Sequence, residues 1–265
     1  MTIPIALTIA GSDSGGGAGI QADLKTFSAL GVYGASVITA VTAQNTCAVT
    51  AVTAISPEVI GAQIEAVFTD LPPQAVKTGM LGDSQTICTV ADSLAAVAPP
   101  FLVIDPVMVA KSGDKLLADA AITTLRERLI PLASLITPNL PEAGELLGRP
   151  ITTRDDMPQA AAELLALGCR AVLLKGGHLT EGVSDDLLLT ADGATWLTAA
   201  RYPTKNTHGT GCTLSAAITA GLAKGLPLEA AVREAKDYIS AAITAADRLH
   251  VGHGHGPLHH FHRWW

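Results

Sequence analysis

Short apolar runs alternate with segments of helical periodicity along most of the chain, and this alternation constrains the fold more than any other feature. The runs that predict buried strands are 3–10, 74–78, 101–105, 132–137 and 171–174. The segments that predict helices are 20–30, 57–69, 83–97, 155–167, 211–223 and 227–248. Such alternation is typical of an α/β fold with a mainly parallel central sheet and helices on both faces.

Two regions depart from this alternation and predict consecutive strands. Segments 34–42 and 48–55 are β-rich, while 184–190 and 194–199 predict a hairpin around Asp192-Gly193. A polar loop at 111–115 precedes a further helix. Since neither an internal repeat nor a break in composition is visible, we expect one domain over residues 1–265.

The composition excludes several classes of protein. Hydrophobic residues make up 48% and charged residues 15% of the 265, without an apolar run long enough for a membrane span. The net charge of -7 and the scattered Lys and Arg argue against nucleic acid or a membrane surface as partner. The four cysteines are far apart, and the start lacks the features of a secretory signal. We therefore expect a cytoplasmic protein with reduced thiols.

The C-terminal segment 250–265 holds six of the eight histidines and two tryptophans. These histidines could catch a transition metal, but no acid or cysteine accompanies them, so they do not predict a genuine metal site. We expect a flexible His-rich tail.

Residues 208–215, His-Gly-Thr-Gly-Cys-Thr-Leu-Ser, close a loop of small residues and open an apolar helix. Free backbone N–H groups and the helix dipole would favour an anion such as a phosphoryl group there. The same positive field would lower the pKa of the Cys212 thiol, which could then accept a proton or attack a substrate. Alternatively, the glycines only start a helix, and Cys212 is a small buried hydrophobe.

The first predicted strand ends in a glycine loop, Gly11-Ser-Asp-Ser-Gly-Gly-Gly-Ala-Gly19, that fits neither the dinucleotide fingerprint nor the P-loop. Such a loop still lets backbone approach a small ligand at the carboxyl end of a buried strand. Asp13 could make a turn and Asp23 could be an exposed acid in the first helical turn, or either could contact a ligand.

Other polar residues follow predicted strands. Gln44 could bind the edge of a heteroaromatic ring or lie in a solvated turn. Asp105 ends a buried strand, which favours a metal or phosphate role. Asn139 and Glu142 have the spacing of a capping box, or could face a hydrated Mg²⁺. Lys175, before a double glycine, is positioned to face a pocket.

Together these segments resemble the ribokinase-like superfamily and, within it, the hydroxymethylpyrimidine/phosphomethylpyrimidine kinases of thiamine biosynthesis. The resemblance runs nearly end to end, including Gly-His-Gly-His-Gly-Pro-Leu in the tail. The motifs that carry it are 10–23, 42–46, 77–81, 105–108, 137–143, 175–178 and 208–213.

The resemblance implies ATP- and Mg²⁺-dependent phosphorylation of 4-amino-5-hydroxymethyl-2-methylpyrimidine, and then of its monophosphate to the pyrophosphate. For phosphoryl transfer the resemblance implies an anion hole formed by the amides of Gly209, Thr210, Gly211 and Cys212, with Cys212 also as the base. It implies a magnesium motif at Asn139 and Glu142 and phosphate contacts at Lys175 and Asp105. For substrate binding it implies recognition of the aminopyrimidine edge by Gln44 and a pocket wall of Gly11, Ala18, Asp23, Met80 and Val107. Many superfamily members have an aspartate base where this chain, like the pyrimidine kinases, has Cys212.

Three alternatives remain open from the sequence. A pyridoxal or pyridoxine kinase, or a kinase with dual activity, shares the fold and the cysteine base. A non-catalytic small-ligand-binding protein and an enzyme that uses Cys212 as a covalent nucleophile are the others. A homodimer is expected because homodimers are common in the resembled family.

Overall fold

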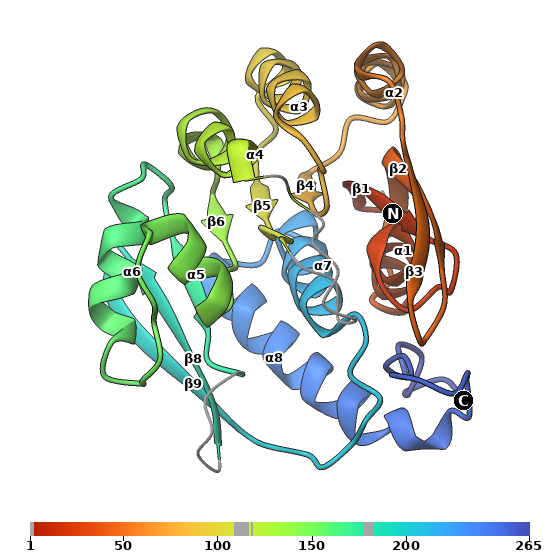
Figure 1. The fold of residues 1–265 in the computed structure, drawn as a ribbon, viewed down its shortest axis with the longest axis vertical. Helices are drawn as coiled ribbons and strands as arrows, with labels where there is room; N and C mark the ends of the chain where they lie inside the picture. Colours follow the sequence, from red (N-terminus) through yellow and green to blue (C-terminus); the bar gives the residue numbers. More distant parts are fainter. Residues whose placement is uncertain (1–2, 109–116, 118, 178–182) are drawn as a thin grey trace.

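The computed structural model describes residues 3–108, 117, 119–177 and 183–265. The strands of this part of the chain join one nine-stranded sheet in the order β3-β2-β1-β4-β5-β6-β7-β8-β9 (Figure 1). The six strands from β2 to β7 are parallel, while β3, β8 and β9 pair antiparallel with their neighbours. The prediction of a mainly parallel sheet is confirmed.

Each predicted strand is present, but two bounds differ: β1 extends three residues beyond 3–10, and β6 is shorter than 132–137 because Leu132 belongs to a 3-10 turn. The strands are β1 Ile5–Asp13, β2 Tyr33–Gln44, β3 Val49–Ala54, β4 Ala75–Thr78, β5 Leu102–Ile104, β6 Leu135–Ile136, β7 Val172–Lys175, β8 Val183–Thr190 and β9 Gly193–Ala200. The hairpin predicted around Asp192-Gly193 is present, with Thr190 opposite Gly193.

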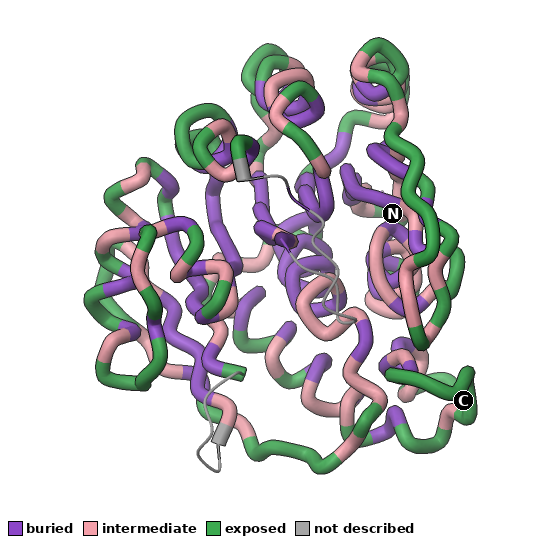
Figure 2. The backbone as a smooth tube through the Cα atoms, viewed as in Figure 1, coloured by how far each residue is buried: buried purple, intermediate pink, exposed green. Residues whose placement is uncertain are grey.

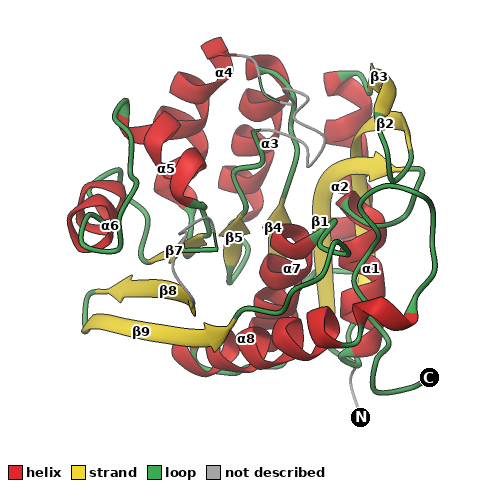
Figure 3. Cartoon of the chain, turned by 60° about the horizontal axis from the view of Figure 1, so that its bottom comes forward, coloured by secondary structure: helices red, strands yellow, loops and turns green. Residues whose placement is uncertain are grey.

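The helices cover both faces of the sheet (Figures 1 and 3). On one face lie α2 Pro57–Asp70, α3 Ser84–Val97, α4 Asp119–Thr124, α5 Leu140–Leu147 and α6 Met157–Leu165. On the other lie α1 Gly19–Ala29, α7 Thr210–Ala223 and α8 Leu228–Thr244.

Alternate residues of each strand supply the two cores, because successive side chains of a strand point to opposite faces. Leu7 and Ile9 of β1 pack against the α2–α6 face, whereas Ala6 packs against the α1, α7 and α8 face. The residues of both cores are buried, and Figure 2 shows that burial is concentrated along the central strands and α7. Parallel strands buried on both faces are nearly continuously hydrophobic, which is why they could be predicted from sequence.

Helix bounds differ from the prediction where the chain leaves α geometry. α4 has six residues and passes into a π turn, Leu125–Leu129, and a 3-10 turn, Ile130–Leu132, that contains Pro131. α8 ends at Thr244 and a 3-10 turn, Ala246–Arg248, follows. The polar loop 111–115 lies outside the described residues.

The prediction of a flexible tail is wrong. Leu258, His259 and His260 are at most 4% exposed, and the tail packs beside α1 and the β2–β3 turn (Figure 1). Three glycines make this possible, because a Cβ on Gly254 would lie 2.1 Å from the Thr46 carbonyl oxygen and those on Gly252 and Gly256 would clash similarly. Imidazole rings therefore serve here as packing and hydrogen-bonding groups.

Candidate active site

The start of α7 is held against the glycine loop by backbone contact. Gly209 has a φ of 82°, and a Cβ there would lie 1.9 Å from the carbonyl oxygen of Gly17, so no other residue fits. The first α-helical hydrogen bond runs from Thr213 N–H to Gly209 C=O. In the described part of the chain no acceptor takes the N–H groups of Gly211 and Cys212, which leaves them available to an anion.

Cys212 lies in the first turn of α7 and is partly buried. Burial raises the pKa of its thiol to about 11, although the Lys77 ammonium and the backbone N–H of Gly19 oppose the rise. The sequence-based expectation of a lowered pKa is therefore wrong. The positive field of the helix start stabilises the thiolate, but the free-energy cost of removing the thiolate from water is larger than this stabilisation.

A sealed ion pair, Lys77–Asp23, lies near the thiol. Lys77 Nζ is 2.8 Å from both carboxylate oxygens of Asp23, and the Thr8 hydroxyl donates to one of them at 2.6 Å. Neither charged side chain is exposed to solvent. Although burial disfavours the ammonium, Asp23 and then Cys212 raise the pKa of Lys77, which stays charged.

This environment differs from both sequence-based interpretations of Asp23. It is neither an exposed first-turn acid nor a free carboxylate on a pocket wall, because its oxygens are taken by Lys77 and Thr8. Sequence reasoning missed Lys77, although a lysine inside the apolar strand Ala75–Thr78 was a usable signal.

A second cluster, the Lys175 cluster, joins Lys175 at the end of β7, Asp105 directly after β5 and Glu142 in the first turn of α5. Lys175 Nζ is 3.0 Å from Asp105 Oδ1 and 3.9 Å from Glu142 Oε2. It also lies at the start of α7, since a Cβ on Gly211 would be 3.3 Å from it. Thr137 and Ser215 donate hydroxyl hydrogen bonds to Asp105 at 3.2 and 3.3 Å.

Charges in this cluster depend on one another. Burial opposes ionisation of Asp105, but Lys175 and Lys77 together lower the pKa of its carboxyl. Burial raises the pKa of Glu142 to about 7, against the opposing effect of Lys175 and with a further rise from Asp105. Glu142 thus changes its charge near neutral pH.

The capping-box interpretation of the Asn139–Glu142 spacing is confirmed, and the magnesium role stays a prediction. The capping box is present: Asn139 Oδ1 accepts from the Glu142 N–H at 2.9 Å, and Glu142 Oε2 accepts from the Asn139 N–H at 2.7 Å. The box starts α5 and at the same time turns the Glu142 carboxylate toward Lys175.

The glycine loop is organised by Asp13. Its carboxylate accepts the N–H groups of Gly15, Gly17 and Ala18 at 2.8 to 3.0 Å, and His208 Nε2 lies 2.9 Å from Oδ2. Of the alternatives for Asp13, the structure thus favours the turn-making role.

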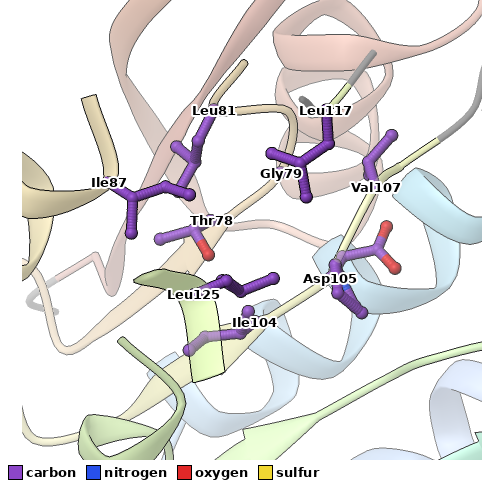
Figure 4. A pocket seen from close by; sticks show the side chains of 10 residues that line it. Thr78, Gly79, Leu81, Ile87, Ile104, Asp105, Val107, Leu117 and Leu125 are labelled. Atoms are coloured by element: carbon purple, nitrogen blue, oxygen red, sulfur yellow. The ribbon is translucent and has the colours of Figure 1, made fainter. Parts of the chain in front are cut away.

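The residues that the resemblance assigns to substrate lie at two places on this edge. Gln44 Nε2 is 3.5 Å from His208 Nε2, beside a recess that the turn 45–48 and His255 complete. Gly11 lies against Met80, whose Cε would be 2.6 Å from a Cβ there. Val107 lines a mainly apolar recess at the ends of β4 and β5, with Asp105 at its edge (Figure 4).

These groups meet at the carboxyl ends of β1, β4, β5 and β7, where open α/β sheets place their ligands. A lysine, two carboxylates and a glycine-rich helix start form a site that suits transfer of a charged group. The fold and this site define a ribokinase-like kinase.

The chain belongs to the phosphomethylpyrimidine kinase family, whose model matches residues 13–259. It is 58% identical to a hydroxymethylpyrimidine/phosphomethylpyrimidine kinase of Rhizobium meliloti, with 98% of each chain covered. It is 52% identical to the thiamine biosynthesis bifunctional protein ThiED of Geobacter sulfurreducens, over 96% of this chain and 51% of that protein. Among solved structures, an ADP complex of Bacillus subtilis pyridoxal kinase is similar with a TM-score of 0.90 and 40% identity, over 98% of both chains.

Proposed function

We propose that this protein transfers the terminal phosphoryl group of ATP to the hydroxymethyl group of 4-amino-5-hydroxymethyl-2-methylpyrimidine, and then a second one to the monophosphate. The observation that carries the proposal is the position of Lys175, which lies between Asp105, Glu142 and the backbone of Gly211 at the start of α7. A phosphate at this point would meet an ammonium group and free amides together.

The residues present fit Mg²⁺ as well as ATP. Mg²⁺ usually keeps several waters and binds one or two carboxylates together with substrate phosphates. In the described residues no three His, Cys, Asp or Glu side chains gather into a metal site, but Glu142 and Asp105 lie side by side around Lys175. Glu142, supported by Asn139, would hold the ion, and the bound ion would neutralise charge on the phosphates.

The chain's own residues then account for the transfer. Lys175, together with the amides of Gly209, Gly211 and Cys212, would hold the transferred group in line with the alcohol. The Thr210 N–H, which the resemblance also assigns to the anion hole, already donates to Thr207 C=O at 3.3 Å. As the new O–P bond forms and the bond to the leaving diphosphate breaks, the alcohol proton passes to the Cys212 sulfur. The step requires the thiolate, because a thiol cannot accept this proton. Burial raises the pKa of Cys212 to about 11 and the Lys77 ammonium opposes the rise, so the fraction of the enzyme that has lost the thiol proton to solvent carries out the step.

Gln44, at the carboxyl edge of the sheet, would recognise the pyrimidine ring. Its amide can donate to and accept from the aminopyrimidine edge, and it already contacts His208 and Thr42. Gly11, Ala18, Met80 and Val107 would line the remaining pocket. Asp23 would act through Lys77, because both its oxygens are occupied.

A pyridoxal kinase activity is the second candidate, favoured by the likeness to the Bacillus subtilis pyridoxal kinase. Both substrates are hydroxymethyl heteroaromatic alcohols, and one amide at Gln44 could accommodate either ring. The ratio of kcat/KM for the two alcohols separates the candidates.

The test is an assay with ATP, Mg²⁺ and the pyrimidine alcohol in which monophosphate and pyrophosphate products are followed over time. We expect both products in sequence, and none when EDTA removes Mg²⁺. Failure to consume ATP would favour a ligand-binding protein, and a stable covalent adduct on Cys212 by mass spectrometry would favour the thiol nucleophile.

We also infer a cytoplasmic homodimer. No helix of the described residues is both long and apolar enough to span a bilayer.

The proposed dimer surface includes β3. β3 is an edge strand with exposed apolar residues such as Val52, which is 52% exposed and suits contact with a second copy. Light scattering would measure the mass in solution.

A further inference from the structure

The buried tail makes a hydrogen bond directly beside the proposed base. His260 is 4% exposed, and its Nε2 lies 3.0 Å from the hydroxyl of Thr213. Thr213 is completely buried and follows Cys212 in the first turn of α7. A residue 47 positions further along the chain therefore contacts the turn that carries the thiol.

The direction of this hydrogen bond follows from the surroundings of the ring. Burial lowers the pKa of His260 to about 4, so the imidazole is neutral. Among the described residues the Thr213 hydroxyl has no other hydrogen-bond partner to which it could donate. Nε2 is then the acceptor, and Thr213 is the donor.

The backbone of His260 is fixed independently. The Tyr238 hydroxyl of α8 donates to the His260 carbonyl at 2.6 Å, and the His259 N–H donates to Ala242 C=O at 3.2 Å. Further back, the tail is tied to the turn after β2 and to the loop before α7, through His255 N–H to Thr46 C=O and His208 N–H to Gly256 C=O. These contacts hold the tail whether or not the ring of His260 bonds to Thr213.

Without an acceptor on His260, the Thr213 hydroxyl would turn to a carbonyl one turn earlier in its own helix. That carbonyl belongs to Gly209, which already accepts from the Thr213 N–H at 2.8 Å. Such bonding bends helices, and here the bend would fall on the turn that carries Cys212 and the free N–H groups.

We propose that His260 is a positioning residue, which orients the first turn of α7 through Thr213. It thereby aims the Cys212 sulfur at the hydroxyl of the substrate alcohol and the adjacent N–H groups at the phosphoryl group. This inference rests on the proposed function, in which Cys212 is the base. It gives the C-terminal tail a part in turnover beyond its part in the core.

The test compares Thr213→Val, which removes the donor at constant shape, with His260→Leu, which removes the acceptor. We expect each to lower kcat by roughly 10-fold with little change in either KM, because misplacement affects the transition state more than binding. The double variant should lose no more than either single one, since both remove the same hydrogen bond. His260→Gln, whose amide oxygen reaches about as far as Nε2, should recover most of kcat.

The matched control is His259→Gln, which alters the neighbouring buried histidine of the tail. Its ring lies against Trp265, and in the described residues no hydrogen bond joins it to α7. It should keep kcat even if it unfolds at a lower temperature. Equal kcat losses in His259→Gln and His260→Leu, or a normal kcat in Thr213→Val, would overturn the proposal. If His260→Leu fails to fold, Thr213→Val decides alone.

A second readout separates this inference from the proposed function. The rate at which iodoacetamide alkylates Cys212 can be measured by peptide mass spectrometry, with exposed Cys47 as the internal reference. A rate shifted about equally in Thr213→Val and His260→Leu would support the positioning role even if the wild-type protein phosphorylated no pyrimidine. An unchanged rate in both variants would overturn it.

Discussion

Two lysine–carboxylate groups lie at the carboxyl edge of the same sheet, and they differ in contact with solvent. Lys77 and Asp23 are both completely buried, and the ammonium reaches both carboxylate oxygens at 2.8 Å. Lys175 and Glu142 keep 12% and 11% of their side chains exposed, and Lys175 reaches one Asp105 oxygen at 3.0 Å. Both ammonium groups interact electrostatically with the Cys212 sulfur.

The difference in exposure implies a difference in role. A sealed pair cannot exchange its partner for a ligand, so Lys77 supplies a fixed positive charge near the thiol. The Lys175 cluster has one lysine for two carboxylates and can rearrange when phosphate or Mg²⁺ arrives. The four predictions below use this comparison, from the largest expected effect to the smallest.

The charges of both lysines interact with the Cys212 sulfur, so its removal tests the role that the two groups share. Cys212→Ala should lower kcat by roughly 10²- to 10⁴-fold, the usual contribution of a general base, and leave nucleotide binding nearly intact. Single-turnover kinetics and ATP titration by calorimetry measure the two quantities. Equal loss of turnover and of nucleotide binding would contradict the assignment of Cys212 as the base.

Lys77→Met should lower the free energy of unfolding by about 3–5 kcal/mol, because it leaves the Asp23 carboxylate buried without a compensating positive charge and with only the Thr8 hydroxyl as donor. Urea denaturation measures the loss. The double variant Lys77→Met with Asp23→Leu should regain much of the stability and still turn over slowly, since the fixed charge near Cys212 is absent. A stable Lys77→Met single variant would break the distinction between the two groups.

Lys175→Met should lower kcat by about 10²- to 10³-fold, a typical cost of losing one preorganised donor at a developing charge. Its urea midpoint should fall less than that of Lys77→Met, because Thr137 and Ser215 still donate to Asp105. Arg154→Met is the control, because Arg154 also pairs with a buried carboxylate, that of Asp185, which is 5% exposed. A loss of kcat in the control equal to that in Lys175→Met would show that any lost ion pair has this effect.

The smallest effect concerns the pH dependence from Glu142. Its pKa of about 7 lies above the ordinary 4.5, so the folded protein holds a proton that the unfolded chain has lost between these two pH values. The contribution of Glu142 to stability therefore decreases as pH rises from 4.5 to 7, and is constant above that range.

Glu142→Gln should remove this decrease, which urea denaturation at pH 5 and pH 7.5 would detect. It should also remove the rise in kcat that ionised Glu142 produces between about pH 6 and pH 8 in the wild type. Glu65→Gln, at an exposed position on α2, is the control and should leave both profiles unchanged. Identical profiles for wild type and Glu142→Gln would mean that Glu142 stays ionised and that the Lys175 cluster is as fixed as the sealed pair.

Much of the fold could be predicted because strands buried on both faces are continuously apolar, as in 3–10 and 171–174. The capping box at Asn139 and Glu142 could be predicted because cap and helix are local in sequence. Lys77 could not be assigned a role in this way, since its partner Asp23 is 54 residues away on another element. The packed tail was missed because histidine and glycine are typical of mobile ends, and only the contacts with Thr46, Thr213 and Tyr238 account for its order.

The sequence alone determined the alternation of strands and helices, the helix start at Gly209 to Cys212 and the family resemblance, since periodicity, caps and motifs are local patterns. Only the tertiary structure decided which lysine is sealed and which is open, and how the thiol titrates. Burial and the distances between charges set these properties, and both depend on chain segments that meet only after folding.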